Sequence, residues 1–194
     1  MKDKLLKYLI KNSSLSKEKL QKITESIPLH TFRKGTILLR QGNISTQCFF
    51  VLKGCIRQYF YDPEGKERTI NFFIEEQSIV DFNSYLQKTP SDYFLSCVED
   101  STLVIGNSDM ENEMYKNFPE LESINLTLVE QNFGSTQKAF ASFMSSTAEE
   151  RYLSLLKTRP ELVQRVPQHQ LASYLGITPE SFSRIKKRLG GFKK

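Results

Sequence analysis

The stretch HQLASYLGITPESFSRIKKRL, residues 169–189, decides how the C-terminal part of this chain folds. Its first half carries apolar residues at helical spacing and ends at Gly176, where the chain can turn sharply because glycine tolerates positive φ. Thr178 is suited to cap a second helix, and Pro179 fits the first helical position because it has no N–H to leave unpaired. The stretch therefore predicts two short helices joined by a tight turn.

The predicted second helix has one apolar and one basic face. Phe182, Ile185 and Leu189 recur at i, i+3 and i+7 and form the apolar face. The opposite face carries the polar and charged side chains, which are Glu180, Ser181, Arg184, Lys187 and Arg188. Such a pair of helices is typical of a helix-turn-helix, whose second helix enters the major groove of DNA. A hairpin that only packs against the rest of the protein is the alternative.

Positive charge is concentrated at the C-terminal end of the chain. Residues 151–194 carry ten Lys or Arg and two acidic residues, a net charge of +8, whereas residues 1–150 carry 17 basic and 20 acidic residues, a net charge of −3. The total of +5 conceals this asymmetry. A basic region of this kind favours contact with a polyanion, so we expect double-stranded DNA to be the partner.

The composition is that of a folded protein without secretion or membrane signals. The 194 residues are 39% hydrophobic and 25% charged, enough for one ordinary core and a second, small one. The sequence has no run of 18 apolar residues, and the N-terminus MKDKLLKYLIKNSS lacks the apolar segment and cleavage site of a signal peptide. Cys48, Cys55 and Cys97 show no CxxC spacing, so we expect reduced thiols and no zinc site. These features predict a cytoplasmic protein with no membrane contact.

Three compositional zones predict an α+β fold. Runs of β-branched and aromatic residues extend from Leu29 to Leu103 and indicate a compact antiparallel barrel or sandwich. Apolar residues recur helically from Pro119 to Met144, which predicts one long helix, and three or four short helices follow from Ser146. The predicted domains are residues 1–110 for the barrel, 111–145 for the long helix and 146–194 for the helix-turn-helix.

The chain resembles the Crp/Fnr transcription regulators over nearly its whole length. The resemblance lies in FRKGTILLRQGN (32–43), FFVLKGCIRQYF (49–60) and the GKE of residues 65–67, together with the long helix and the C-terminal helix pair. It implies an N-terminal jelly-roll, or double-stranded β-helix, of the cyclic-nucleotide-binding type, followed by a dimerisation helix and a winged helix-turn-helix. It also implies a homodimer on a palindromic operator, with RNA polymerase as a further partner if the protein activates transcription.

The resemblance assigns DNA-binding roles to the C-terminal helices. Glu180 and Arg184 match the positions of the recognition helix that contact bases, and Ser181 lies on the same edge. The residues expected at DNA phosphates are His169, Thr178, Lys187 and Arg188. Pro179 departs from the family, in which an Arg often stands at this position. Because the sequence ends soon after the recognition helix, we expect any wing to come from residues before His169.

In the sensor half, the resemblance places acids where a cyclic-nucleotide site needs a cation. The family's site has a Gly-Glu pair, followed by an Arg and a small hydroxyl residue that bind the phosphate, and the matching positions here are Asp81-Phe82 and Asp92-Tyr93. Because Asp92 would repel a phosphate, the sequence predicts no cyclic-nucleotide binding. The candidate effector pocket comprises Asp81, Phe82, Tyr85, Asp92 and Tyr93. It either takes a less anionic molecule or is filled by its own aromatic side chains.

The long helix carries the candidate dimer seam. Leu121, Ile124 and Leu128 lie at i, i+3 and i+7, and we expect them to meet their copies across a two-fold axis. The residues on another face, expected to pack on the barrel or on the C-terminal domain, are Val129, Phe133 and Phe140. The long helix therefore predicts a homodimer.

The competing classes are a cupin-like enzyme and a regulatory subunit that binds a small molecule without DNA. Cupin-like metal chemistry needs two or three histidines and a carboxylate at one metal, whereas the sequence has only His30 and His169. It has no G-x-S-x-G elbow, no P-loop and no clustered N-terminal cysteines. We therefore predict no catalytic residue, no metal and no cofactor, and a small-molecule-binding barrel protein with a helical interaction domain remains the alternative.

Overall fold

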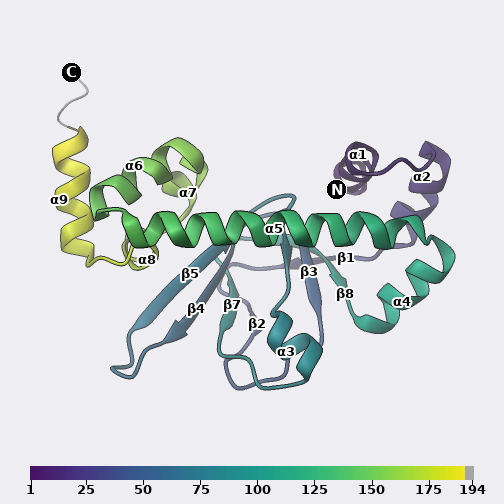
Figure 1. Cartoon of the computed structure of the whole chain (residues 1–194), viewed down its shortest axis with the longest axis horizontal. Helices are drawn as coiled ribbons and strands as arrows, with labels where there is room; N and C mark the ends of the chain where they lie inside the picture. The colour runs from purple at the N-terminus through teal and green to yellow at the C-terminus, as the bar shows by residue number, and fades with distance from the viewer. Residues whose placement is uncertain (191–194) are drawn as a thin grey trace.

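The computed structural model describes residues 1–190 of the chain, apart from the side chains at positions 123, 124, 127, 128, 131, 132 and 190. Figure 1 shows the long helix α5 (Glu120–Ser145) crossing one side of a β-sheet body. The N-terminal helices lie near the beginning of α5, and the C-terminal helices lie near its end (Figure 1). The two helical groups are therefore separated by the length of α5.

Within the described residues, eight strands form two four-stranded sheets. The first sheet has the strand order β1-β8-β3-β6 and the second has the order β2-β7-β4-β5, with antiparallel pairing throughout. The strands are β1 (Leu29–Phe32), β2 (Ile37–Leu39), β3 (Cys48–Lys53), β4 (Ile56–Tyr61), β5 (Glu67–Phe73), β6 (Ser78–Ile79), β7 (Phe94–Cys97) and β8 (Ser101–Gly106). Two packed antiparallel sheets of four strands are the arrangement of a jelly-roll. The predicted fold class is thus confirmed.

Alternate residues of the strands form the barrel core. Along β3, Phe49 and Val51 are buried, whereas Cys48 and Phe50 are only half-buried, as expected when one face of a strand meets the core. The buried cluster between the sheets comprises Leu39, Phe49, Val51, Ile56, Ile79, Leu95, Cys97 and Leu103. The other face of β3 is left to contact the helices.

The turn between β3 and β4 requires glycine at position 54. Gly54 has a φ of +114°, and a Cβ atom there would lie 2.2 Å from Ser101 Oγ. Glycine alone combines this backbone conformation with so close an approach. The Gly54 N–H donates a hydrogen bond to Glu75 Oε1 (2.9 Å), so the turn also positions a carboxylate at the end of β5.

The N-terminal helices α1 (Lys2–Asn12) and α2 (Lys17–Ser26) form a hairpin beside the first sheet. The Lys2 ammonium donates to the carbonyl oxygen of Thr24 (2.6 Å), which places a positive charge at the C-terminal end of α2, where the helix dipole favours it. The Tyr8 ring contacts the Phe50 ring on β3, with the centroids 4.6 Å apart. The hairpin shares a small core with α5 that contains Leu20, Ile23 and Leu121.

Two further helices connect these parts. α3 (Phe82–Gln87) lies between β6 and β7, and α4 (Ser108–Asn117) follows β8. α4 ends shortly before Pro119, and α5 begins at Glu120. The residue before a proline disfavours the helical conformation, which explains why residues 111–145 form parts of two helices.

The C-terminal part consists of helices, namely α6 (Ala148–Thr158), α7 (Pro160–Arg165), α8 (Gln168–Tyr174) and α9 (Pro179–Gly190). This agrees with the three or four short helices predicted from the sequence. No strand occurs between residues 146 and 190, so this described stretch contains no wing. The segment before His169 forms α7 instead, because Pro160 at the first helical position and the fully buried Leu162 favour a helix there.

The C-terminal helices and the barrel share one hydrophobic core. Cys55, Phe72 and Val98 of the barrel are buried in the same cluster as side chains of α6, α7, α8 and α9. The helical members of the cluster are Tyr152, Leu155, Leu162, Val166, Leu171, Ala172, Leu175, Phe182 and Ile185. The Phe72 ring on β5 meets the Tyr174 ring on α8 edge-on, with the centroids 5.4 Å apart. The predicted boundary at residue 146 therefore separates stretches of chain and not separate cores.

Arg165, at the end of α7, connects the shared core to two loops of the barrel. Its guanidinium donates to both carboxylate oxygens of Glu75 (2.9 and 3.0 Å) and, through Nε and Nη2, to Glu99. Burial alone would raise the pKa of Glu75, but the hydrogen bonds from Arg165 and Gly54 outweigh it and hold the pKa below its ordinary value. Hydrogen bonding to Glu75 in turn raises the pKa of Arg165. We call Arg165, Glu75 and Glu99 the Arg165 network.

Removing Arg165 should destabilise the protein by about 2 kcal/mol. In Arg165→Ala, Glu75 and Glu99 would keep their charge while losing a partner that is itself only 23% exposed. The measurement is the free energy of unfolding in urea. The matched control is Arg68→Ala, which breaks an ion pair with Asp62 in which Arg68 is 48% exposed and which should cost less than about 1 kcal/mol. Equal costs for the two variants would contradict a stabilising role of the Arg165 network.

Candidate nucleic-acid interface

The two predicted helices of the quoted stretch are α8 and α9, joined at Gly176. Gly176 has a φ of +69°, and a Cβ atom there would lie 3.1 Å from the ring of Phe143 near the end of α5. Leu171, Ala172 and Leu175 of the first helix are buried, as their spacing predicted. The turn is therefore tight, and it is packed against the end of the long helix.

Thr178 caps the second helix as predicted. The Ser181 N–H donates to Thr178 Oγ1 (3.2 Å), and α9 begins at Pro179. Phe182 is 1% exposed and meets the Tyr152 ring of α6 edge-on, with the centroids 5.3 Å apart. Ile185 is buried beside it, so the apolar face of α9 is anchored in the shared core.

The opposite face of α9 is available to a ligand. Glu180, Arg184 and Lys187 are exposed, and Ser181 is half-buried because it also contacts Thr178. Hydrogen bonds from its own backbone N–H and from Thr178, together with the nearby Arg184 charge, lower the pKa of Glu180. Glu180 is thus an ionised acceptor and Arg184 is a donor, one helical turn apart.

The residues predicted to contact phosphate differ in their exposure and in the partners that they already have within the chain. His169 is exposed near the start of α8, and Lys187 is exposed on α9. Thr178 is already engaged as the helix cap. The Arg188 guanidinium pairs with Glu149 of α6 across the surface, an interaction that sequence spacing does not reveal. Arg188 therefore has an ion-pair partner within the chain.

The positions matched to the cyclic-nucleotide site come together only in part. Asp81 caps α3 and accepts a hydrogen bond from Ser91 Oγ (2.6 Å), which brings the segment before α3 beside the loop that carries Asp92. Burial raises the pKa of Tyr93, and the carboxylates of Asp92 and Asp81 raise it further. Two acidic groups therefore lie at this place.

Two members of the candidate effector pocket point elsewhere. Phe82 is 49% exposed, so it does not fill a pocket. Tyr85 is buried and donates to Glu111 Oε2 of α4 (3.1 Å). The side chains of α3 diverge because the helix turns successive residues to different faces.

The exposed face of α5 differs from the predicted seam. Leu121 is buried against the N-terminal hairpin, and Ile124 and Leu128 lie outside the described side chains. The expectation that Phe133 and Phe140 pack on the barrel or the C-terminal part is wrong, because they are 65% and 67% exposed. Val129 is half-buried.

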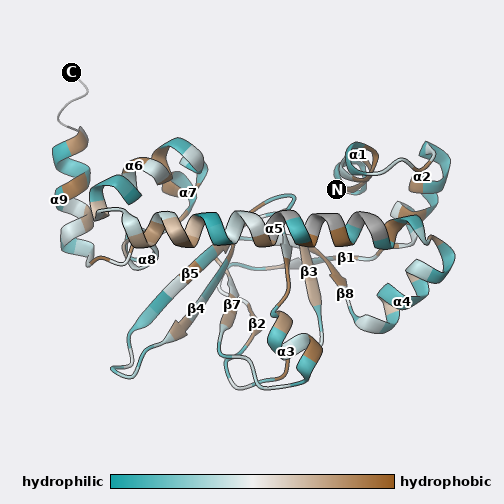
Figure 2. Cartoon of the chain, viewed as in Figure 1, coloured by the Kyte–Doolittle hydropathy of each residue, from teal (hydrophilic) through white to brown (hydrophobic). Residues whose placement is uncertain are grey.

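An apolar stripe runs along this exposed face. Leu126 is 60% exposed and precedes Phe133 by seven residues, and Phe133 precedes Phe140 by seven. We call these three residues the α5 stripe, and Figure 2 shows apolar segments along α5 where it crosses the sheets. The heptad spacing from Leu126 was available in the sequence, but only the structure shows that this face is uncovered.

A metal or thiolate site would depend on the position and the ionisation of the described histidines and cysteines. They contain no group of three or more His, Cys, Asp or Glu side chains placed to hold a metal ion. His30 lies on β1 and His169 on α8, so the two histidines do not form a site. Burial raises the pKa of Cys48 and of Cys55 to about 12, which keeps both thiols protonated. Within the described part of the chain, no helix is both long and apolar enough to cross a membrane.

Comparisons with known proteins agree with this architecture. Residues 29–117 match the cyclic nucleotide-binding domain family, whereas a comparison with curated proteins finds no sequence match. The c-di-GMP-responsive global regulator CLP of Xanthomonas campestris is 14% identical with a TM-score of 0.69, and the alignment covers 91% of this chain and 92% of that one.

Two further solved structures match this chain with similar sequence identities and TM-scores. FixK2 of Bradyrhizobium japonicum is 15% identical with a TM-score of 0.67 and 85% of both chains covered. TTHA1359, a transcriptional regulator of the CRP/FNR family from Thermus thermophilus, is 17% identical with a TM-score of 0.66, and 86% of this chain and 87% of that one are covered. The chain thus carries a cyclic nucleotide-binding-type domain at residues 29–117 and has the fold of the Crp/Fnr transcription regulators.

Proposed function

We propose that this chain is a DNA-binding transcription regulator that binds a palindromic operator as a homodimer and has no catalytic activity. The observation that carries the proposal is the second helix of the helix-turn-helix. Its apolar face is anchored by Phe182 and Ile185, while Glu180 and Arg184 remain exposed at its N-terminal half. A DNA-bound regulator acts in the cytoplasm of a bacterial cell, and an activator would also contact RNA polymerase.

In this proposal the N-terminal half of α9 enters the major groove. Arg184 donates to the O6 and N7 acceptors of guanine, and the ionised Glu180 accepts from the cytosine amino group. Ser181 lies between them and contacts either type of base edge. The residues assigned to phosphates are His169, Thr178, Lys187 and Arg188, with Arg188 exchanging its partner Glu149 for the DNA backbone. The net charge of +8 after residue 150 supports this assignment.

The α5 stripe supports a homodimer. Three large apolar side chains at heptad spacing, each at least 60% exposed, form a surface that a second copy of α5 would cover. A two-fold dimer that binds a palindromic operator needs its two recognition helices about 34 Å apart, one turn of DNA. We therefore place the dimer seam on Leu126, Phe133 and Phe140, with Ile124 and Leu128 as the alternative face.

We also propose that the barrel does not respond to cyclic AMP. A cyclic phosphate needs a cation, and the place matched to that cation has Asp92 with Asp81 nearby. Two carboxylates would repel the phosphate and leave it without a charged donor. A signal at the barrel can still reach DNA, because α8 is docked on β5 through the shared core.

The first prediction concerns base contacts. Arg184→Ala should weaken binding to the operator by about 1–3 kcal/mol and relax the preference at one base pair, because a bidentate contact is lost. The measurement is a titration of the purified protein against single-base variants of a sequence selected from random DNA. Lys157→Ala is the control, since Lys157 is an exposed basic residue of α6 that is assigned no DNA contact. Unchanged selectivity in Arg184→Ala would remove Arg184 from the interface.

The second prediction concerns the dimer. Leu126→Glu should shift the protein towards monomer, because two unpaired like charges would be desolvated in the seam. Leu86→Glu is a matched control, since Leu86 is an apolar side chain on α3 with a similar exposure of 68%. Sedimentation at micromolar concentration distinguishes the two variants. If Leu126→Glu stays dimeric and Leu128→Glu becomes monomeric, the seam lies on the alternative face.

The third prediction concerns cyclic nucleotides. Neither cyclic AMP nor cyclic GMP should raise the Tm of the protein, because Asp92 occupies the place of the phosphate-binding cation. The measurement is thermal unfolding with and without each nucleotide. A ligand at 100 times its Kd would stabilise the folded state by about 2.7 kcal/mol. A rise of several degrees in Tm would therefore disprove this part of the proposal.

A further inference from the structure

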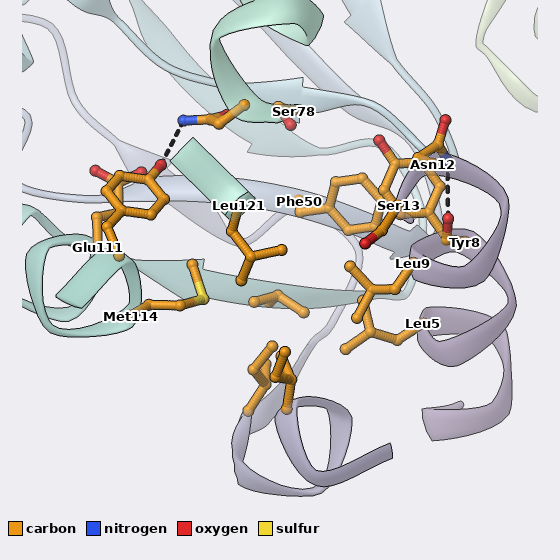
Figure 3. A pocket seen from close by; sticks show the side chains of 15 residues that line it. Leu5, Tyr8, Leu9, Asn12, Ser13, Phe50, Ser78, Glu111, Met114 and Leu121 are labelled. Carbon is orange, nitrogen blue, oxygen red and sulfur yellow. Dashed lines mark hydrogen bonds between the residues drawn. The ribbon is translucent and has the colours of Figure 1, made fainter. Parts of the chain in front are cut away.

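A cavity lies between the N-terminal hairpin, α4, the start of α5 and the outer face of the first sheet. Figure 3 shows side chains from all of these elements converging on it. Its volume is about 190 Å³. It is distinct from the cyclic-nucleotide-type site, because Asp81, Asp92 and Tyr93 do not line it.

The floor and the walls of the cavity are mainly apolar, with Ser78 in the floor and Asn12 and Ser13 beside Tyr8 as the polar exceptions. Phe50 on β3 is the cross-strand partner of both Ser78 on β6 and Val104 on β8, so one transverse row of the first sheet forms the floor. The side walls come from Leu5 and Leu9 of α1 and from Met114 of α4 (Figure 3). Close-packed interiors leave few voids larger than a water molecule. A dry engineered cavity of about 150 Å³ already binds benzene.

The end of the cavity beside α4 carries a carboxylate. Glu111 lies one turn before Tyr115 on α4, and the hydroxyl of Tyr115 accepts a hydrogen bond from Asn125 Nδ2 of α5 (2.7 Å). Glu111 accepts hydrogen bonds from Tyr85 and Cys48, which leaves acceptor capacity on its carboxylate. This end therefore offers a negatively charged acceptor and a hydroxyl group, with no Lys or Arg among the residues that line the cavity.

We propose that this cavity binds a small, neutral aromatic molecule that carries one hydrogen-bond donor, such as a phenol. The ring would lie on Phe50 among the leucines, and its donor would meet Glu111. The volume fits a single ring with a short substituent and is below the range of about 300–1,000 Å³ that holds drug-sized ligands. The Glu111 carboxylate disfavours anions, which separates this ligand class from nucleotides and carboxylic acids.

The cavity is placed to influence α5. Leu121 and Asn125 belong to its lining and to the first two turns of the helix that carries the α5 stripe. Any effect of this ligand on DNA binding rests on the function proposed above. Binding of the ligand to the cavity is independent of that function, so ligand binding is tested without DNA.

The test is calorimetric titration of the full chain with 4-methylphenol and, separately, with 4-methylbenzoate. We expect 4-methylphenol to bind once per chain and the anion of similar size to bind at least about tenfold more weakly. Leu9→Trp should fill the cavity and weaken 4-methylphenol binding at least about tenfold. Ile10→Trp is the matched control, because Ile10 is the next residue of α1, is 44% exposed and does not line the cavity.

Glu111→Gln supplies a second variant that keeps the size of the side chain. It should reduce the difference between the phenol and the benzoate, because the repulsion of the anion is removed. In the unmodified protein, methyl resonances of Leu5, Ile23 and Val104 should shift on titration, a readout that needs no variant to fold. The proposal is overturned if 4-methylphenol shows no saturable binding, if the benzoate binds equally well, or if Leu9→Trp and Ile10→Trp have the same effect.

Discussion

The burial of Phe72, with Cys55 and Val98, beneath the C-terminal helices is the interaction on which the rest of the structure depends. These barrel residues belong to the same core as Leu162, Leu171 and Phe182. A helix-turn-helix of about 45 residues buries too little apolar surface to be very stable alone, so the barrel supplies part of its core. The Arg165 network lies at the edge of this interface, where its charges remain partly solvated and its hydrogen bonds give the contact a defined orientation.

This shared core holds α8 and α9 against the barrel while it leaves one face of α9 exposed to solvent. The apolar faces of α8 and α9 are directed into the core, and the polar face of α9 is left to solvent. Hydrogen bonds between Ser173 of α8 and both Glu67 and Thr69 of β5 fix the first helix to the edge of the second sheet. A change in the barrel that moves β5 would therefore also move α8 and, through the shared core, α9.

Basic and acidic residues are concentrated in different parts of the structure. Basic residues are gathered on the C-terminal helices, whereas acidic residues stand at the place matched to a cyclic phosphate and at the end of the cavity beside α4. Both acidic places oppose anionic ligands, and the basic face favours an anionic one. The electrostatics are thus those of the proposed function, in which the C-terminal part binds DNA and the barrel does not bind a cyclic nucleotide.

The sequence alone determined most of the secondary structure, because helices, strands and turns depend on patterns within a few neighbouring residues. Helix caps, glycines at positive φ and heptad or alternating apolar patterns act over a few residues, so α8, α9 and the cap at Thr178 were predicted closely. The jelly-roll followed from strand runs and from the family resemblance. Only the tertiary structure decided which apolar faces are covered: it buries Leu121 beneath the N-terminal hairpin, leaves Phe133 and Phe140 exposed, and forms α7 in place of a wing. Burial depends on which distant segments meet, and so do the pairing of Arg165 with Glu75 and the cavity between α1, α4 and the first sheet. Such contacts join residues far apart in the chain, and no local pattern in one sequence records them.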